Sequence, residues 1–322
     1  MIRRINFDFC GHKKLWMIIS GGILAFGILF NLIFGSVVDI QFTGGAIVKY
    51  SFSGDVAADA IEAVVSEAIG KPVEIQINTN VISAQSATPI NNLSVSISEG
   101  LTVDQQKLML ETLQEKFADN KFDQLNSSSV DPTMGGEFFL KCLIAILLAA
   151  VLMVVYVAFR FRKIGGWSAG VFALVALVHD IVVVYFTFVV FRLPINDNFI
   201  AVALSILGYS LNDTIVIYDR VRENRRLLGP KASLDVLVNN SLNQTFSRTF
   251  LTALCTLLAV AAVSVVAFIY NIESILTFSL PMMLGVISGF YSSVCLSGPG
   301  WVMWQNFKAK KKLEKRQAAK KK

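Results

Sequence analysis

Residues 199–218 read FIAVALSILGYSLNDTIVIY, a run in which Asp213 carries the only charge. An α-helix needs about 20 mostly apolar residues to cross the hydrocarbon core of a bilayer. In the whole chain 54% of residues are hydrophobic and 16% are charged, whereas a soluble domain has roughly 25% charged residues. The sequence therefore predicts a membrane protein, and residues 199–218 predict one of its spanning helices.

Other runs have the length and composition of a spanning helix. They are residues 15–35, 138–159, 166–191, 250–271 and 274–303. The first run follows basic residues, as a signal peptide would, but its apolar core is longer than a signal h-region and no A-x-A-like site follows it. We interpret it as an uncleaved helix and predict an α-helical membrane protein with six transmembrane helices.

The basic residues indicate an orientation. Twenty-two of the 29 Lys and Arg residues lie in the tail 1–14, the turn 160–163, the loop 219–249 and the tail 304–322. Lys and Arg are retained on the cytoplasmic side, so both termini are expected in the cytoplasm of a multi-pass protein of the cytoplasmic (inner) membrane.

The basic tail 304–322 is interpreted as a solvated anchor beside anionic membrane lipids. Docking to a ribosome or a partner is the alternative. The basicity does not indicate nucleic-acid binding, because the rest of the positive charge follows the topology of the spans.

Residues 36–137 form the one large loop, expected to be extracytoplasmic, with five basic and fourteen acidic residues. Its apolar periodicity switches between two and 3.6. The predicted elements are strand 46–52, helix 55–69, strands 73–77 and 93–97, helix 102–117 and strand 125–130. This order is typical of a ferredoxin-like α+β domain. None of the four cysteines lies in this loop, and their spacing fits neither a metal site nor a disulfide framework.

Asp213 is the residue in the spans that most needs an explanation. A carboxylate in hydrocarbon costs a few kcal/mol even on insertion scales. Ser205 and Tyr209 precede it at intervals of four, which predicts a polar stripe facing the bundle interior. We interpret Asp213 as a protonatable site; a structural hydrogen bond is the alternative.

His179 and Asp180 supply a second intramembrane acid. At 1.5 Å per residue, Asp180 lies about 21 Å from the cytoplasmic end of its helix and Asp213 only about 8 Å from the end of its own. The different depths disfavour direct pairing of the two acids. For His179 and Asp180, a satisfied polar cluster between helices is the alternative to a functional role.

Arg248 opens the fifth span at nearly the depth of Asp213, so we expect it to be the counter-ion. The expected supporting polar residues are Ser205, Tyr209, Asn212, Asn243, Gln244, Thr249, His179 and Asp180. No catalytic residue, metal or cofactor is expected. The chain has no Walker A sequence, so energy must come from a partner or an ion gradient.

The motifs resemble one family in chain order. Residues 208–224 (GYSLNDTIVIYDRVREN) and 241–249 (SLNQTFSRT) are similar to signatures of the SecF protein-translocase family. So are Arg160-Phe-Arg162, His179-Asp180 and residues 285–293 (GVISGFYSS). The G-x-x-x-G spacing at Gly285 and Gly289 also allows close helix packing.

Two segments depart from the family pattern. Residues 39–45 read DIQFTGG where the family pattern is similar to G-x-D-F-T-G-G. Residues 130–132 read VDP where V-G-P is usual, so Asp131 replaces the glycine. Both lie where the external domain joins the membrane spans.

The resemblance implies an RND-type half bundle, not an enzyme, that pairs with SecD beside the SecYEG channel, with YajC as a further partner. It implies use of the proton motive force to draw unfolded secretory proteins outward. Carried over by motif, Asp213 is the proton-carrying acid and Arg248 its partner.

Two other classes remain as alternatives. An intramembrane aspartic protease needs two acids at one depth and usually a GxGD sequence, which the chain lacks. An RND-type exporter of small molecules or lipids generally carries two six-helix halves, whereas this chain has one half and no internal repeat.

Overall fold

The computed structural model describes residues 7–54, 56–79, 90–130, 132–229, 232–270 and 272–320. Two compact units divide the chain. One, which we call the bundle, consists of Met1–Val37 and Ile144–Lys322, and the other, the α+β unit, consists of Val38–Leu143. Asp131, one of the two departures from the family pattern, lies outside the described residues.

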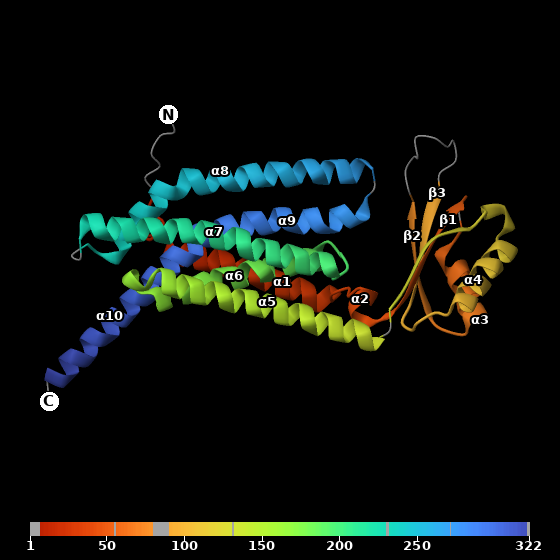
Figure 1. Ribbon diagram of the computed structural model, residues 1–322, viewed down its shortest axis with the longest axis horizontal. Helices are drawn as coiled ribbons and strands as arrows, with labels where there is room; N and C mark the ends of the chain where they lie inside the picture. Colours follow the sequence, from red (N-terminus) through yellow and green to blue (C-terminus); the bar gives the residue numbers. More distant parts are fainter. Residues whose placement is uncertain are drawn as a thin grey trace. The chain divides into compact units, whose positions relative to one another are not determined.

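Long helices build the bundle (Figure 1). In chain order they are α1 (Lys13–Phe34), α5 (Pro132–Arg160), α6 (Gly166–Val190), α7 (Asp197–Leu228), α8 (Leu234–Ile269), α9 (Glu273–Tyr291) and α10 (Gly298–Lys320). A short turn, η2 (Arg162–Ile164), joins α5 to α6, and a π-helical segment, η3 (Ser292–Ser297), joins α9 to α10. In the described part of the chain, six helices are long and apolar enough to cross a membrane.

Two helices extend beyond their apolar runs. Helix α7 continues to Leu228, and α8 begins at Leu234. Ser233 caps α8, because its side chain accepts a hydrogen bond from the backbone N–H of Val236. The loop expected between residues 218 and 250 is therefore largely helical, since apolarity marks the part of a helix in lipid and not its full length.

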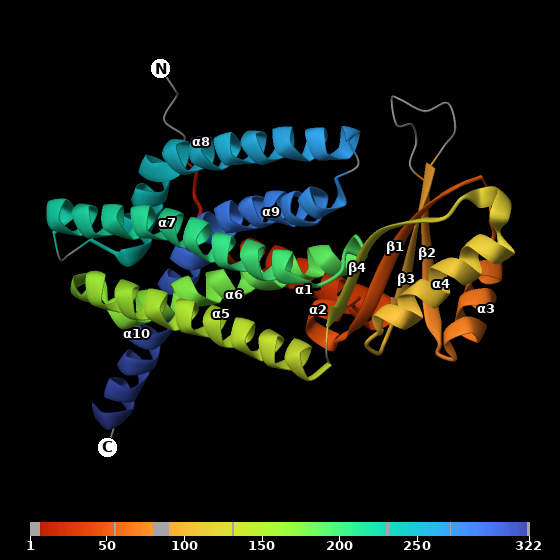
Figure 2. The ribbon, with the colours of Figure 1, turned by 45° about the vertical axis from the view of Figure 1, so that its right-hand side comes forward.

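Helices α6 and α7 form the centre of the bundle. In their most apolar windows 50% and 56% of residues are buried, against 11% in α1, α5 and α8. Gly285 and Gly289 let α9 approach α7 closely, since a Cβ on Gly285 would lie 2.6 Å from Cγ1 of Ile206. Figure 2 shows α7 beside α9 from a second direction. This close packing brings polar groups of three helices together.

The α+β unit contains a four-stranded antiparallel sheet in the order β2-β3-β1-β4. Its elements are α2 (Ile40–Thr43), β1 (Gly45–Ser53), α3 (Ala58–Ile69), β2 (Val73–Thr79), β3 (Ile90–Ile97), α4 (Val103–Lys116), η1 (Ala118–Asn120) and β4 (Asp123–Val130). Helices α3 and α4 cover one face of the sheet (Figure 2). The predicted ferredoxin-like arrangement is confirmed.

The core of this unit lies between the sheet and the two helices. Alternate residues of β1 are buried because successive side chains of a strand point to opposite faces. Tyr50 and Phe52 of β1 meet Ile61 of α3 and Leu113 of α4 in one apolar cluster. Thr102 and Gln105 close a capping box at the start of α4.

Candidate functional site

Asp180 of α6 lies at the centre of a hydrogen-bonded cluster. Its side chain is fully buried. Ser210 of α7, Ser288 of α9 and Ser292 of η3 donate hydroxyl hydrogen bonds to its carboxylate at 2.6, 2.7 and 2.6 Å. These distances match charge-assisted O–H···O⁻ bonds. We call Asp180 and these serines the serine cage; it joins three helices through one carboxylate.

His179 adds to the serine cage on one side. Its Nδ1 lies 3.3 Å from Oδ1 of Asp180 and 3.5 Å from Oγ of Ser288. Its Nε2 is buried and has no hydrogen-bond partner within the described residues. His179 and Asp180 thus lie in one polar cluster between helices.

A polar seam continues from the serine cage along α7 and η3. Thr214 Oγ1 lies 3.0 Å from Oγ of Ser293, and Tyr218 Oη lies 2.7 Å from Oγ of Ser297. Ser293 also donates to the backbone carbonyl of Ser210. The π-helical geometry of η3 aims consecutive serines at different partners on α6 and α7, and π-helical turns frequently occur at functional sites.

Asp213 of α7 lies in a different environment. It is 3% exposed, and its Oδ2 is buried without a hydrogen-bond partner among the described residues. The charge of Arg248 acts on it, but no ion pair within 4.0 Å joins these two described side chains, and Arg248 is exposed on α8. Asp213 is therefore a buried acid whose carboxylate is incompletely satisfied.

The polar stripe expected from Ser205 and Tyr209 to Asp213 does not face the interior of the bundle along its whole length. Ser205 is exposed, and its hydroxyl donates to the carbonyl of Ala201 in its own helix at 2.7 Å. Tyr209 is half-buried and Asn212 is exposed. Residues four apart turn about 40° around a helix with 3.6 residues per turn, so a stripe that is buried at Asp213 has rotated outward at Ser205. The expected inward orientation of Ser205 is wrong for this reason.

The amides expected near Arg248 have other partners. Asn243 exchanges two hydrogen bonds of 2.8 Å with the backbone of Phe7. Gln244 accepts from Nε of Arg220 at 2.6 Å and from Asn224 at 2.9 Å. Thr249 is buried, and its hydroxyl has no partner among the described residues. The structure thus assigns Asn243 and Gln244 to tethering the N-terminal segment and α7, and not to Asp213.

The serines of the cage were not singled out in the sequence. Ser288 and Ser292 stand four residues apart within the quoted motif 285–293, and this spacing was the signal available. Ser210 lies within the quoted motif around Asp213 but faces Asp180 instead.

Comparison with known proteins agrees with this architecture. The model of the family described as protein export membrane protein SecD/SecF, C-terminal, matches residues 109–307. The SecF translocase subunit of Alicyclobacillus acidocaldarius is 31% identical over 95% of this chain and 95% of its own length. The SecDF subunit of Bacillus subtilis is also 31% identical, but the match covers 39% of its length.

Solved structures give the same result. A crystal structure of SecDF from Thermus thermophilus, titled a translocon-associated membrane protein, matches 95% of this chain with a TM-score of 0.77 and 28% identity. A SecDF crystal structure in a super-membrane-facing form matches 98% with a TM-score of 0.67 and 30% identity. The match covers 40% and 41% of those chains, so this chain spans about two fifths of SecDF but nearly the whole of SecF. With its six spanning helices, its ferredoxin-like unit and these matches, the chain belongs to the SecD/SecF family of protein-export membrane proteins.

Proposed function

We propose that this chain is a SecF-type subunit that pairs with SecD and uses the proton motive force to drive late stages of protein export. The names of the SecDF relatives support the pairing, because in them a region like this chain is part of one longer polypeptide. SecYEG and YajC are the further partners that the family implies, and unfolded secretory proteins are the substrate.

The observation that carries proton coupling is the unpartnered, buried Oδ2 of Asp213. An ionised carboxylate in a low-dielectric site needs hydrogen bonds or a paired charge. Protonation of Asp213 removes this penalty. A change in the environment of α7 is therefore expected to shift the carboxylate between its charged and neutral forms. Asp180 differs from Asp213 in that three hydroxyls donate hydrogen bonds to its carboxylate.

The proposed cycle uses one proton at Asp213. A proton from the extracytoplasmic side binds the carboxylate, the attraction of Arg248 is lost, and the helices around α7 repack. Release of the proton to the cytoplasm resets the site. One elementary charge that crosses 100 mV supplies about 2.3 kcal/mol, which is enough to bias two packings of similar energy.

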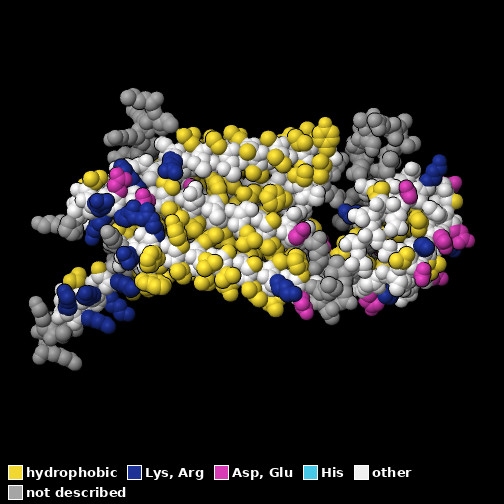
Figure 3. Space-filling view, in the orientation of Figure 1, with side chains coloured by type: hydrophobic (Ala, Val, Ile, Leu, Met, Phe, Trp, Pro, Cys, Tyr) yellow, Lys and Arg dark blue, Asp and Glu magenta, His cyan; other side chains and the backbone are white. Residues whose placement is uncertain are grey.

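The proposed orientation places both termini in the cytoplasm and the α+β unit outside. Basic side chains gather at the end of the bundle that holds the C-terminal helix α10 (Figure 3). The positive-inside rule assigns such an end to the cytoplasm.

Export of a reporter preprotein tests the proposal in cells depleted of the native protein. Asp213→Asn removes the titratable proton and retains size. Export that depends on the proton gradient should fall at least tenfold, while membrane level and copurification of SecD stay unchanged. Ser205→Ala is the matched control on the same helix and should export normally. Normal export by Asp213→Asn at equal membrane level would refute proton coupling through this residue.

An RND-type exporter of small molecules or lipids is the alternative function. Failure to copurify a SecD-type partner, with preprotein export unaffected by depletion, would favour it.

A further inference from the structure

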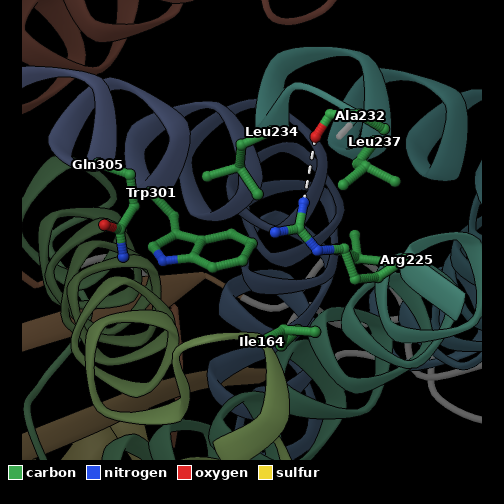
Figure 4. Close-up of a pocket in the computed structure, with 8 residues that line it drawn as sticks. Ile164, Arg225, Ala232, Leu234, Leu237, Trp301 and Gln305 are labelled. Carbon is green, nitrogen blue, oxygen red and sulfur yellow. Dashed lines mark hydrogen bonds between the residues drawn. The ribbon is translucent and has the colours of Figure 1, made fainter. Parts of the chain in front are cut away.

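A cavity of about 360 Å³ lies at the basic end of the bundle. Four elements supply its walls: η2, α7, the start of α8, and α10. The lining residues are Ile164, Val221, Arg225, Ala232, Leu234, Leu237, Trp301 and Gln305. Figure 4 shows the guanidinium of Arg225 reaching between Leu234, Ile164 and the indole of Trp301. The volume is in the range of small-molecule sites, and the lining combines one cation with apolar walls.

Arg225 is half-buried and has no carboxylate partner among the described residues. One of its nitrogens, Nη1, donates to the carbonyl of Ala232 at 3.1 Å. Three other arginines of this end are paired: Arg160 and Arg222 with Asp219, and Arg220 with Glu223. A partly desolvated guanidinium without a counter-ion leaves several N–H donors for an anion.

The start of α8 adds to the positive potential of the cavity. Leu234 and Leu237 come from the first turn of this 36-residue helix, where the helix dipole favours a negative charge. Asp235 of the same turn does not neutralise the cavity. It bonds Lys13 and Asn306 and lines a second cavity. Among the described residues, no carboxylate belongs to the cavity lining to compensate the charge of Arg225.

The apolar walls and the neighbouring surface indicate a ligand from the membrane. Trp301 is fully buried beneath the cavity. Next to Gln305 on α10, Trp304 and Phe307 are exposed, and Lys308 lies 5.3 Å from the Trp304 ring centroid. Exposed Trp beside Lys is typical of the depth of lipid headgroups. A free phosphate compound would match the arginine but would leave the apolar walls in water.

We propose that this cavity binds an anionic membrane phospholipid, with Arg225 donating to the phosphodiester and the apolar walls contacting the first part of the acyl chains. Basic pockets between spanning helices suit such headgroups. The inference stands independently of proton coupling and export. It assigns a specific lipid site where the sequence indicated only a general attraction to anionic lipid.

Native mass spectrometry of the full chain in detergent tests the site. The probes are phosphatidylglycerol and phosphatidylcholine with the same acyl chains. The wild type should bind one phosphatidylglycerol at least fivefold more tightly than phosphatidylcholine, and Arg225→Gln should abolish this preference. Arg226→Gln is the matched control, because Arg226 is exposed and lies outside the cavity lining. The affinity of Arg226→Gln for phosphatidylglycerol should be within twofold of that of the wild type.

Two further arms keep the test decisive. Ala232→Phe fills the cavity and leaves the charge of Arg225 in place. This variant should weaken the binding of phosphatidylglycerol as strongly as Arg225→Gln does. Glycerol 3-phosphate is the soluble competitor and should not displace the lipid at millimolar concentration. Equal loss of binding in the Arg225 and Arg226 variants, or retention in the Ala232 variant, would overturn the site. Displacement by glycerol 3-phosphate would identify a soluble phosphate ligand instead of a lipid.

Discussion

Asp180 and Asp213 are both carboxylates buried among the spanning helices, yet their surroundings differ. Asp180 accepts three short hydroxyl hydrogen bonds from three elements. Asp213 has a buried oxygen with no hydrogen-bond partner among the described residues, and the charge of Arg248 acts on it without forming an ion pair. Burial alone does not define the role of an intramembrane acid; what distinguishes them is how completely each charge is satisfied.

The difference has an energetic consequence. A buried charge with all its hydrogen bonds stabilises the arrangement that satisfies it, and removing one partner leaves others unsatisfied. An incompletely satisfied charge stabilises its surroundings less and changes its protonation more readily. We therefore assign Asp180 to joining helices and Asp213 to the proposed proton step, and the following tests are ranked by expected change in the free energy of unfolding.

Asp180→Ala should have the largest effect. The substitution leaves three buried hydroxyls without their acceptor, and we expect a loss of about 3–5 kcal/mol. Reversible unfolding of the purified chain in mixed micelles with SDS measures this loss. Leu177→Ala, also buried in α6, controls for a cavity alone. A loss of less than about 1 kcal/mol would mean that the serine cage does not hold the helices together.

Single serine substitutions should have intermediate effects. Ser292→Ala and Ser210→Ala each remove one donor to a charged acceptor, worth about 1.5–3 kcal/mol, and the same unfolding assay measures them. Because both serines bond Oδ2 of Asp180, the double variant should depart from additivity. Ser264→Ala is the control, since its hydroxyl bonds within α8 and to Met283. Equal losses in the control and the cage variants would contradict a special role for the cage.

Tyr50→Phe should stabilise the α+β unit by about 1 kcal/mol, because the Tyr50 hydroxyl is buried and has no hydrogen-bond partner in the part of the unit that the structure describes. Urea unfolding of the isolated segment 44–130 measures the change. Tyr50 thus extends the comparison between buried polar groups with and without hydrogen-bond partners to the α+β unit. A destabilised variant would show that the hydroxyl has a partner in solution.

The same variant carries a pH dependence. Burial raises the pKa of the Tyr50 phenol above its ordinary value of 10.0. Above about pH 10 the unfolded chain releases the phenolic proton while the folded unit retains it, so the wild-type unit loses stability as the pH rises above 10. The Tyr50→Phe variant has no phenolic proton and does not share this loss. The advantage of Tyr50→Phe over the wild type should therefore grow between pH 10 and pH 11. A constant difference over that range would contradict the raised pKa.

Asp213→Asn should have the smallest effect on stability, less than about 1 kcal/mol, because it removes no complete set of hydrogen bonds. The SDS unfolding assay measures it beside Asp180→Asn, which should lose more. An equal loss in both variants would remove the distinction between the two acids.

Much of the architecture was predictable from the sequence. Run length and apolarity predicted the spanning helices because the cost of placing polar residues in lipid is local. Alternation and helical spacing predicted the order of strands and helices in the α+β unit, because the periodicity of apolar residues is also a local property of the sequence. The carboxylate in residues 199–218 marked Asp213 as a residue needing an explanation, and the structure shows it buried.

The partners of the polar groups were less predictable. Depth along the membrane suggested that Arg248 and Asp213 would meet, but depth gives no direction around a helix axis. Asn243 and Gln244 turn toward Phe7 and α7 instead. The spacing of four that linked Ser205 to Asp213 drifts around the helix, and this drift exposes Ser205.

The sequence by itself determined which segments enter the membrane, which segment forms the α+β unit, and which acid stands in an apolar run. Only the tertiary structure decided that Asp180 meets Ser288 and Ser292, which follow it by 108 and 112 residues. It also decided that Arg225 lines a cavity with no counter-ion among the described residues. The physical reason is that transfer free energy and periodicity are properties of neighbouring residues. Contacts between helices depend instead on their rotation, their close approach at Gly285 and Gly289, and the π-helical turn at η3.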